Sequence, residues 1–251
     1  MPELAADREL EVLELFGKKI VALDLGREIS PEIPHYPGHM KTTFWWHLTH
    51  DECKMRLGDT PFDGYGVKGI VMCDHVSTHV DAVYHFNKNR PDLTVDKIPL
   101  QTLVTPAAWI DLSSAAPRTS IALAQVKTAL EAAEVTLKPG MALLYDVGIH
   151  DAWDDIPKYV TQYPGLNAEA TAWILDQGVV NIGTDATSLD SPADITYPNH
   201  TVHGERLVVH TENLTNITKI PRHDGFYFAM FPLKFAGLTG SPVRAFALWE
   251  A

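Results

Sequence analysis

The chain has 251 residues and a mass of 27.8 kDa, which fits one large domain with a sizeable core. Its net charge of −12 argues against binding to nucleic acid or to an anionic membrane surface, since both need clustered positive charge. No stretch approaches the ~20 apolar residues of a membrane span, and the N-terminus lacks the features of a signal peptide. Two cysteines, Cys53 and Cys73, could form at most one disulfide, which is too few to stabilise a domain of this size. We therefore expect the protein to be located in the reducing cytoplasm.

The first predicted element is an amphipathic helix over residues 3–16, because apolar side chains recur there at roughly helical spacing and Gly17 follows as a stop signal. Its apolar stripe needs cover, either from its own domain or from a partner subunit. A short strand is expected at 20–25. A loop rich in proline and glycine follows at 26–39, and loops held on a scaffold often carry function.

Short strands dominate the rest of the chain. Strands are expected at 41–49, 69–73, 142–147, 179–182, 207–210, 226–231 and 243–248, helices at 123–133 and 167–177, and irregular structure at 51–68. Because many strands follow one another without a helix between them, we predict a single α/β domain with a mixed sheet rather than a doubly wound one.

Histidine is the unusual residue type of this chain. There are twelve, and three of them lie in the segment CDHVSTHVDAVYHF. His75 and His79 would share one face of a helix, whereas His79 and Asp81 would share one face of a strand. In either conformation imidazole and carboxylate groups converge, and these donors suit Zn, Mn, Fe or a similar divalent ion. An ion with an open coordination position would lower the pKa of a water from about 16 towards 7. The alternative is a set of unrelated surface or core histidines.

The same segment resembles the HxGTHxDxPxH signature of the metal-dependent cyclase-type hydrolases, a family that includes bacterial kynurenine formamidase and isatin hydrolase. It reads His75-Val76-Ser77-Thr78-His79-Val80-Asp81-Ala82-Val83-Tyr84-His85, so the three histidines, Thr78 and Asp81 match. Ser77 replaces the usual glycine and Val83 replaces the usual proline. Four further segments with a likeness to the family follow in family order, and the resemblance covers roughly residues 20–248.

The resemblance implies an α/β fold with a mixed, barrel-like central sheet flanked by helices, in homodimers or higher oligomers such as tetramers. It also implies a divalent metal site that activates water against an amide or lactam carbonyl. By the same resemblance, His75, His79 and Asp81 are metal ligands and His85 is the catalytic acid or base.

Two later residues, His200 and Glu212, resemble the ligands that complete a second metal position in the formamidases. The isatin hydrolase branch leads us to expect a single metal, so the resemblance implies one or two ions per subunit, Zn or Mn. Spacing alone does not choose His200 over His203, and only the family spacing to Glu212 favours it. His203 and His210 are otherwise expected to be structural or exposed to solvent.

Acidic and aromatic residues supply the remaining candidates. Asp185 and Asp190 flank a turn after a predicted strand, and we expect a structural role, such as holding a histidine tautomer. An aromatic pocket for a flat substrate is predicted from other side chains, although each could equally pack in the core. The candidates for this pocket are Phe44, Trp45, Trp46, Phe62, Tyr65 and Tyr84.

The predicted reaction is hydrolysis of a C–N bond in a small cyclic or N-acyl aromatic amide, such as an isatin-like lactam or an N-formylkynurenine-like formamide. Metal-activated water would attack the carbonyl, and His85 would move a proton to the leaving nitrogen. A lactone hydrolase with the same chemistry and a non-catalytic metal-binding module are the alternatives. The sequence contains neither a G-x-S-x-G elbow nor a P-loop motif, which argues against a serine hydrolase and a nucleotide-binding protein.

Overall fold

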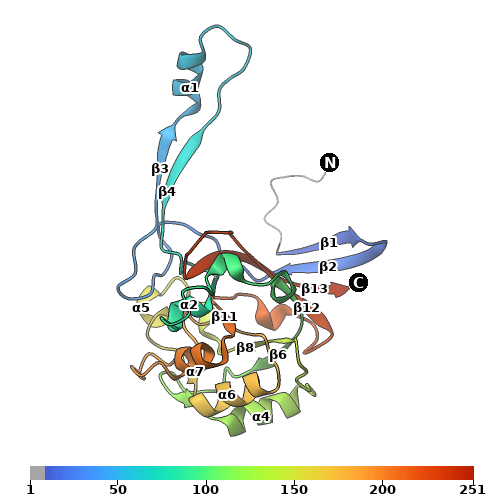
Figure 1. Ribbon diagram of the computed structural model, residues 1–251. Coiled ribbons are helices and arrows are strands. Elements are labelled where there is room, and N and C mark those ends of the chain that lie inside the picture. The colour runs from blue at the N-terminus through green and yellow to red at the C-terminus, as the bar shows by residue number, and fades with distance from the viewer. Residues whose placement is uncertain (1–8) are drawn as a thin grey trace.

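The computed structural model describes residues 9–251 and shows a closed sheet at the centre of the molecule (Figure 1). Its strands are β5 (His79–Asp81), β6 (Val104–Asp111), β8 (Ala142–Asp146), β10 (Asn181–Thr184), β11 (Val209–Glu212), β12 (Phe226–Pro232) and β13 (Gly240–Glu250). They follow one another in the spatial order β13-β12-β6-β8-β10-β11-β5, and β5 pairs back onto β13. Neighbours from β6 to β11 run parallel and the remaining pairs run antiparallel. The predicted mixed, barrel-like α/β sheet is confirmed.

Three helices pack together against one side of the barrel, namely α4 (Leu123–Ala132), α6 (Ala168–Asp176) and α7 (Pro198–Arg206) (Figure 1). Strand β8 is buried on both faces, with Leu143 in the apolar cluster under α4 and α6 and Leu144 in the second cluster. Continuous apolar strands of this kind are typical of parallel sheets covered on both sides. Helices α4 and α6 confirm the predicted helices at 123–133 and 167–177. No helix within residues 9–251 is long and apolar enough to cross a membrane.

Shorter elements connect the barrel strands. They are β7 (Ser120–Ile121), β9 (Gly165–Leu166), α2 (Val83–Phe86), α3 (Leu100–Leu103), α5 (Ile156–Tyr159) and the single 3₁₀ turns Val95–Lys97, Ile149–Ala152 and Ile217–Lys219. Helix α2 is the one that matters for the site described below, because it follows β5 directly.

The predicted N-terminal helix is wrong over the part that the structure describes. Residues Leu10–Leu15 form strand β1, which pairs antiparallel with β2 (Lys18–Asp24), and residues 3–8 lie outside the described part. Phe16 and Gly17 make the hairpin turn, both with positive φ, as a two-residue turn between twisted strands requires. Strand β2 pairs with β13, and β1 pairs with β2. Residues 10–15 therefore extend the sheet, although their apolar spacing also suits a helix.

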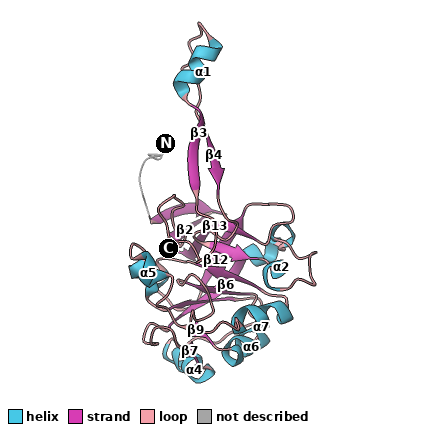
Figure 2. Cartoon of the chain, turned by 90° about the vertical axis from the view of Figure 1, so that its left-hand side faces the viewer, coloured by secondary structure: helices cyan, strands magenta, loops and turns pink. Residues whose placement is uncertain are grey.

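A long β-hairpin projects from the barrel, and we call it the arm (Figures 1 and 2). It comprises residues 43–71, in which β3 (Thr43–Leu48) and β4 (Val67–Val71) pair with each other, α1 (His50–Leu57) lies at the tip, and a loop leads from α1 back to β4. The helix is a correction to the irregular structure expected there. It begins at a capping box in which Thr49 and Glu52 satisfy each other's backbone N–H groups.

Candidate metal centre

Two neighbouring strands supply the centre of the site. Strand β5 carries His79 and Asp81, and its antiparallel partner β11 places His210 opposite Asp81 and Glu212 opposite His79. Side chains two residues apart on a strand share a face, so all four point to the same side of the sheet. Each is at most 4% exposed. The barrel therefore buries two carboxylates next to two imidazoles.

The other histidines of the motif close around Asp81. His75 lies in the loop before β5, with its Nδ1 2.6 Å from Asp81 Oδ1, and His79 Nε2 lies 3.1 Å from the same oxygen. His85 comes from α2, and its Nε2 lies 3.6 Å from Asp81 Oδ2. The rings of His75 and His85 are only 4.0 Å apart between centroids. The structure thus brings together all four ionisable residues that the sequence motif singled out.

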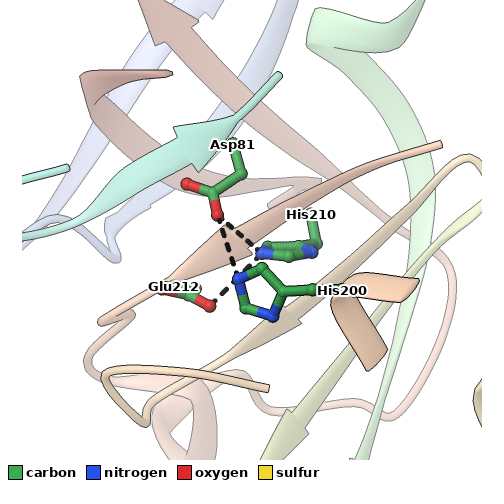
Figure 3. A group of neighbouring side chains, drawn as sticks. All are labelled: Asp81, His200, His210 and Glu212. Carbon is green, nitrogen blue, oxygen red and sulfur yellow. Dashed lines mark hydrogen bonds and ion pairs between the residues drawn. The ribbon is translucent and has the colours of Figure 1, made fainter. Parts of the chain in front are cut away.

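Helix α7 brings His200 to Asp81, and Figure 3 shows it there together with His210 and Glu212. His200 Nε2 lies 3.7 Å from Asp81 Oδ2. Asp190 fixes this orientation, because its Oδ2 accepts the His200 backbone N–H and lies 2.5 Å from His200 Nδ1. Its Oδ1 accepts the backbone N–H of Asn199, so Asp190 also caps the N-terminus of α7.

These residues lie at a cavity of about 330 Å³, a size that suits a small aromatic molecule. The cavity is lined by Tyr36, His39, His75, His79, Asp81, His85, Phe86, Thr187, Ser188, Tyr197, His200, Thr201 and Glu212. The hydroxyl oxygens of Tyr36 and Tyr197 are 3.0 Å apart, which ties the proline-rich loop to the start of α7. The acidic centre therefore lies in a half-open cavity that Tyr36, Phe86 and Tyr197 help to line.

A family model described as "Putative cyclase" matches residues 23–191. The chain belongs to this putative cyclase family. It is 27% identical to the kynurenine formamidase of Salinibacter ruber over 89% of this chain and 95% of that protein. It is 29% identical to the isatin hydrolase of Roseibium aggregatum over 76% of each. The crystal structure of an isatin hydrolase bound to the product analogue thioisatinate has the same fold, with a TM-score of 0.81 at 22% identity, over 92% of this chain and 93% of that one.

The two buried carboxylates at the centre of this putative cyclase protein, Asp81 and Glu212, need positive charge next to them. Burial by itself raises the pKa of Asp81, but the surrounding histidines hold it well below its usual value. Burial and the charge of Asp81 likewise oppose ionisation of Glu212, yet hydrogen bonds from His210 and His79 lower its pKa to about 2. Burial disfavours the charged imidazoles, but the two carboxylates prevail and raise the pKa of His79 well above its usual value and that of His210 to about 9. Protons on these rings are what a divalent ion would displace.

The donor atoms fall into two groups that share one carboxylate. His75, His79 and Asp81 form the first, with ligand atoms all within 4.8 Å of one another. Asp81, His200, His210 and Glu212 form the second by the same measure. Imidazole nitrogen and carboxylate oxygen around buried negative charge fit one or two divalent ions.

The aromatic residues proposed for the substrate pocket lie elsewhere in this chain. Phe44, Trp45, Trp46, Phe62 and Tyr65 belong to the arm, Tyr84 is in α2, and none of the six lines the cavity. The aromatic side chains that do line it are Tyr36, Phe86 and Tyr197. Their sequence positions offered a signal, since Phe86 follows His85 directly and Tyr197 precedes His200 by three residues.

The departure of Ser77 from the family motif has a local explanation. Ser77 adopts a left-handed backbone with φ of 55°, a conformation that glycine reaches without strain. Its hydroxyl shares one hydrogen between the carbonyl oxygens of Arg27 and Glu28, at 3.2 Å and 3.1 Å, which offsets part of that strain. Its own carbonyl accepts a hydrogen bond from His79 Nδ1 and thereby leaves Nε2 facing the carboxylates.

A separate acidic group forms where β8 and β10 end. Asp185 accepts backbone N–H groups from Val147, Ile149 and His150, which confirms a structural role. Hydrogen bonds with Asp146 and Asp185 raise the pKa of His150 to about 10. None of these residues lines the cavity. The single positive charge that this pKa favours on His150 offsets part of the charge of Asp146 and Asp185, of which Asp185 holds the loop after β8.

Proposed function

We propose that this protein is a metal-dependent amidohydrolase that cleaves the C–N bond of a small cyclic or N-acyl aromatic amide. The observation that carries the proposal is the convergence of His75, His79, His85 and His200 on the buried Asp81 at the cavity. Two relatives are named kynurenine formamidase and isatin hydrolase, which favours an N-formylkynurenine-like or isatin-like substrate.

The metal belongs to the proposal because the donor set fits it. His75, His79 and Asp81 would hold one divalent ion, Zn or Mn, and Asp81 with His200 and Glu212 would hold a second. A bound ion supplies a water of lowered pKa and a positive charge for the substrate carbonyl oxygen. The protein's own task is to hold these five side chains before the substrate arrives. The strand register holds His79, Asp81 and Glu212, Asp190 holds His200, and Thr239 contacts His75.

His85 is suited to moving the proton. Burial lowers the pKa of His85 to about 4, so its imidazole is neutral near neutral pH, and in the tautomer with hydrogen on Nδ1 its Nε2 can accept a proton from the attacking water. Asp81 Oδ2, 3.6 Å away, stabilises the imidazolium that forms. The same nitrogen then returns the proton to the leaving nitrogen. Tyr36, Phe86 and Tyr197 would hold the aromatic ring of the substrate beside it.

A homo-oligomer, dimer or tetramer, completes the proposal, with the arm packed on a second copy. A two-stranded hairpin is marginally stable alone, and this one exposes Trp45, Trp46 and Ile70. The aromatic side chains of the arm can contact substrate only in the cavity of another copy, because they do not line their own. Free Cys53 and Cys73 fit the proposed location in the reducing cytoplasm.

Metal content paired with a turnover screen tests the function. The purified protein is analysed for metal, stripped with a chelator and reloaded with Zn or Mn, and each form is assayed on isatin, N-formylkynurenine and a simple lactone. We expect bound metal, activity that chelation abolishes and one metal restores, and preference for an amide. Preference for the lactone would make this a lactone hydrolase, and bound metal without turnover of any compound would favour the non-catalytic module. Absence of metal and of metal dependence would overturn the proposal.

A further inference from the structure

His210 occupies a position that the family resemblance does not explain. Strand β11 places it directly opposite Asp81 and on the same face as Glu212. Its Nε2 lies 2.8 Å from Asp81 Oδ2 and 3.2 Å from Glu212 Oε1. His200 Nε2 approaches the same Asp81 oxygen from α7, and Figure 3 shows all four side chains turned toward one point.

We propose that His210 is a fourth protein ligand at the second metal position, beside Asp81, His200 and Glu212. This inference rests on the proposed function, because it assumes that the centre holds metal. The four donors make a set of two nitrogens and two oxygens, which matches the four-coordinate preference of Zn and encloses the second ion more fully than three donors would. The second position would then bind its ion tightly, and the first, with three donors, would keep an open place.

The tautomer that ligation requires is supported by a second buried histidine. If His210 Nε2 binds metal, its proton sits on Nδ1 and needs an acceptor. Nδ1 is buried and has no hydrogen-bond partner among residues 9–251. The ring of His203 lies edge-on to it, with centroids 4.7 Å apart at 86°. His203 Nδ1 bonds to the carbonyl of Val208 and therefore carries the hydrogen, which leaves His203 Nε2 as a buried acceptor that is also unpartnered.

A donor without an acceptor and an acceptor without a donor thus lie on adjacent rings. A hydrogen bond from His210 Nδ1 to His203 Nε2 would remove the cost of two buried unsatisfied groups. His203 is accordingly a positioning residue that holds His210 with Nε2 toward the carboxylates. The competing arrangement is an imidazolium at His210 that neutralises Asp81 and Glu212 and takes the place of the second ion.

Metal stoichiometry separates these arrangements. Metal-free wild type is titrated with Zn²⁺ against a competing chelator, together with His210→Ala, His203→Leu and the control His47→Ala, an exposed histidine of the arm. We expect two equivalents for wild type and for the control. For His210→Ala we expect one tight equivalent and a second weakened by about 100-fold or more, and for His203→Leu a second weakened by about 10-fold. An unchanged second equivalent in His210→Ala, or a single equivalent in wild type, overturns the inference and leaves the proposed function standing.

Wild type without bound metal would instead overturn the proposed function itself. Because an alanine in a buried cluster could prevent folding, a second measurement uses the intact protein. Histidine ¹⁵N spectra of the Zn²⁺-loaded wild type should show His210 with a proton on Nδ1 only and a metal-shifted Nε2. A doubly protonated His210 ring in the loaded protein would overturn the inference.

Discussion

Asp190 holds His200 at two points, because one carboxylate oxygen accepts its backbone N–H and lies 2.5 Å from its ring Nδ1. Helix capping and ligand orientation are therefore carried by the same side chain. The buried carboxylate keeps the proton of His200 on Nδ1 and turns Nε2 toward Asp81, which is the tautomer that a metal ligand needs.

Replacing Asp190 with Asn should weaken the second metal position. An amide can present its N–H₂ group to Nδ1 and shift the proton of His200 to the metal-facing nitrogen, so we expect the second Zn²⁺ to bind about 10- to 100-fold more weakly. Competitive chelator titration measures this loss. Asp194→Asn is the matched control, since Asp194 caps an exposed turn nearby, and it should bind both ions as wild type does. Equal weakening in both variants would remove the orienting role of Asp190.

Replacing His85 with Ala should separate proton transfer from metal binding. The variant loses the group that accepts and returns the proton, so kcat should fall by about 10²- to 10⁴-fold while the metal content stays unchanged. Steady-state kinetics and metal analysis on the same preparation make the comparison. A His79→Ala variant provides the contrast, because it removes a ligand and should lose metal first. Near-normal turnover by His85→Ala would exclude its proposed role.

Ser77 offers a test of backbone strain at the motif. Ser77→Ala keeps the left-handed backbone and loses the hydroxyl bonds to Arg27 and Glu28. Ser77→Gly loses the same bonds but removes the strain, so it should be more stable than the alanine variant by about 1 kcal/mol. Denaturant unfolding of both metal-free variants measures the difference in free energy of unfolding. An alanine variant as stable as the glycine variant would show that this position is unstrained.

Spacing within the sequence predicted the local part of the site, whereas the distant residues His200 and Glu212 were expected only from the family resemblance. His79 and Asp81 share a strand face because side chains alternate along any strand, and this holds before tertiary structure is known. The pairing of Asp81 with His210 depends on the register between β5 and β11, which are separated by more than a hundred residues and meet only when the barrel closes. The position of His210 beside Asp81 therefore had no sequence signal beyond its two-residue spacing from Glu212.

Two further differences arise from tertiary context. Residues 10–15 have apolar spacing that suits a helix, but pairing of β1 with β2 at the barrel edge stabilises a strand instead. Helix α7 was not predicted, because its few apolar side chains give no clear stripe and the carboxylate that accepts its first N–H groups belongs to Asp190, eight residues before the helix begins. Aromatic composition near the motif indicated a pocket, yet β3 and β4 pair only with each other and carry those rings away from the barrel.

The charge on His150 should make stability depend on pH. Hydrogen bonds with Asp146 and Asp185 raise its folded-state pKa from 6.5 to about 10, so the stabilisation is complete below pH 6.5 and is lost as the pH rises toward 10. Replacing His150 with Gln should lower the free energy of unfolding by about 1–2 kcal/mol at pH 6, allowing for the partial exposure of the ring. Urea unfolding of both proteins from pH 6 to 10 should show the difference shrinking. A difference independent of pH would contradict a protonated His150.

The arm should determine the oligomeric state. Phe44 pairs across the hairpin with Ile70, and Trp46 pairs with Lys68, so Trp46 and Ile70 share one face and are 52% and 58% exposed. Replacing both with Asp places two charges on that face, and light scattering after size exclusion should change from a multiple of 27.8 kDa to a single copy. The control Asp63→Asn, at the arm's exposed tip, should keep the wild-type mass. An unchanged mass in the double variant would mean that the arm does not hold the copies together. If the arm also contacts substrate in a second copy, the monomeric variant should keep its metal ions and bind substrate more weakly.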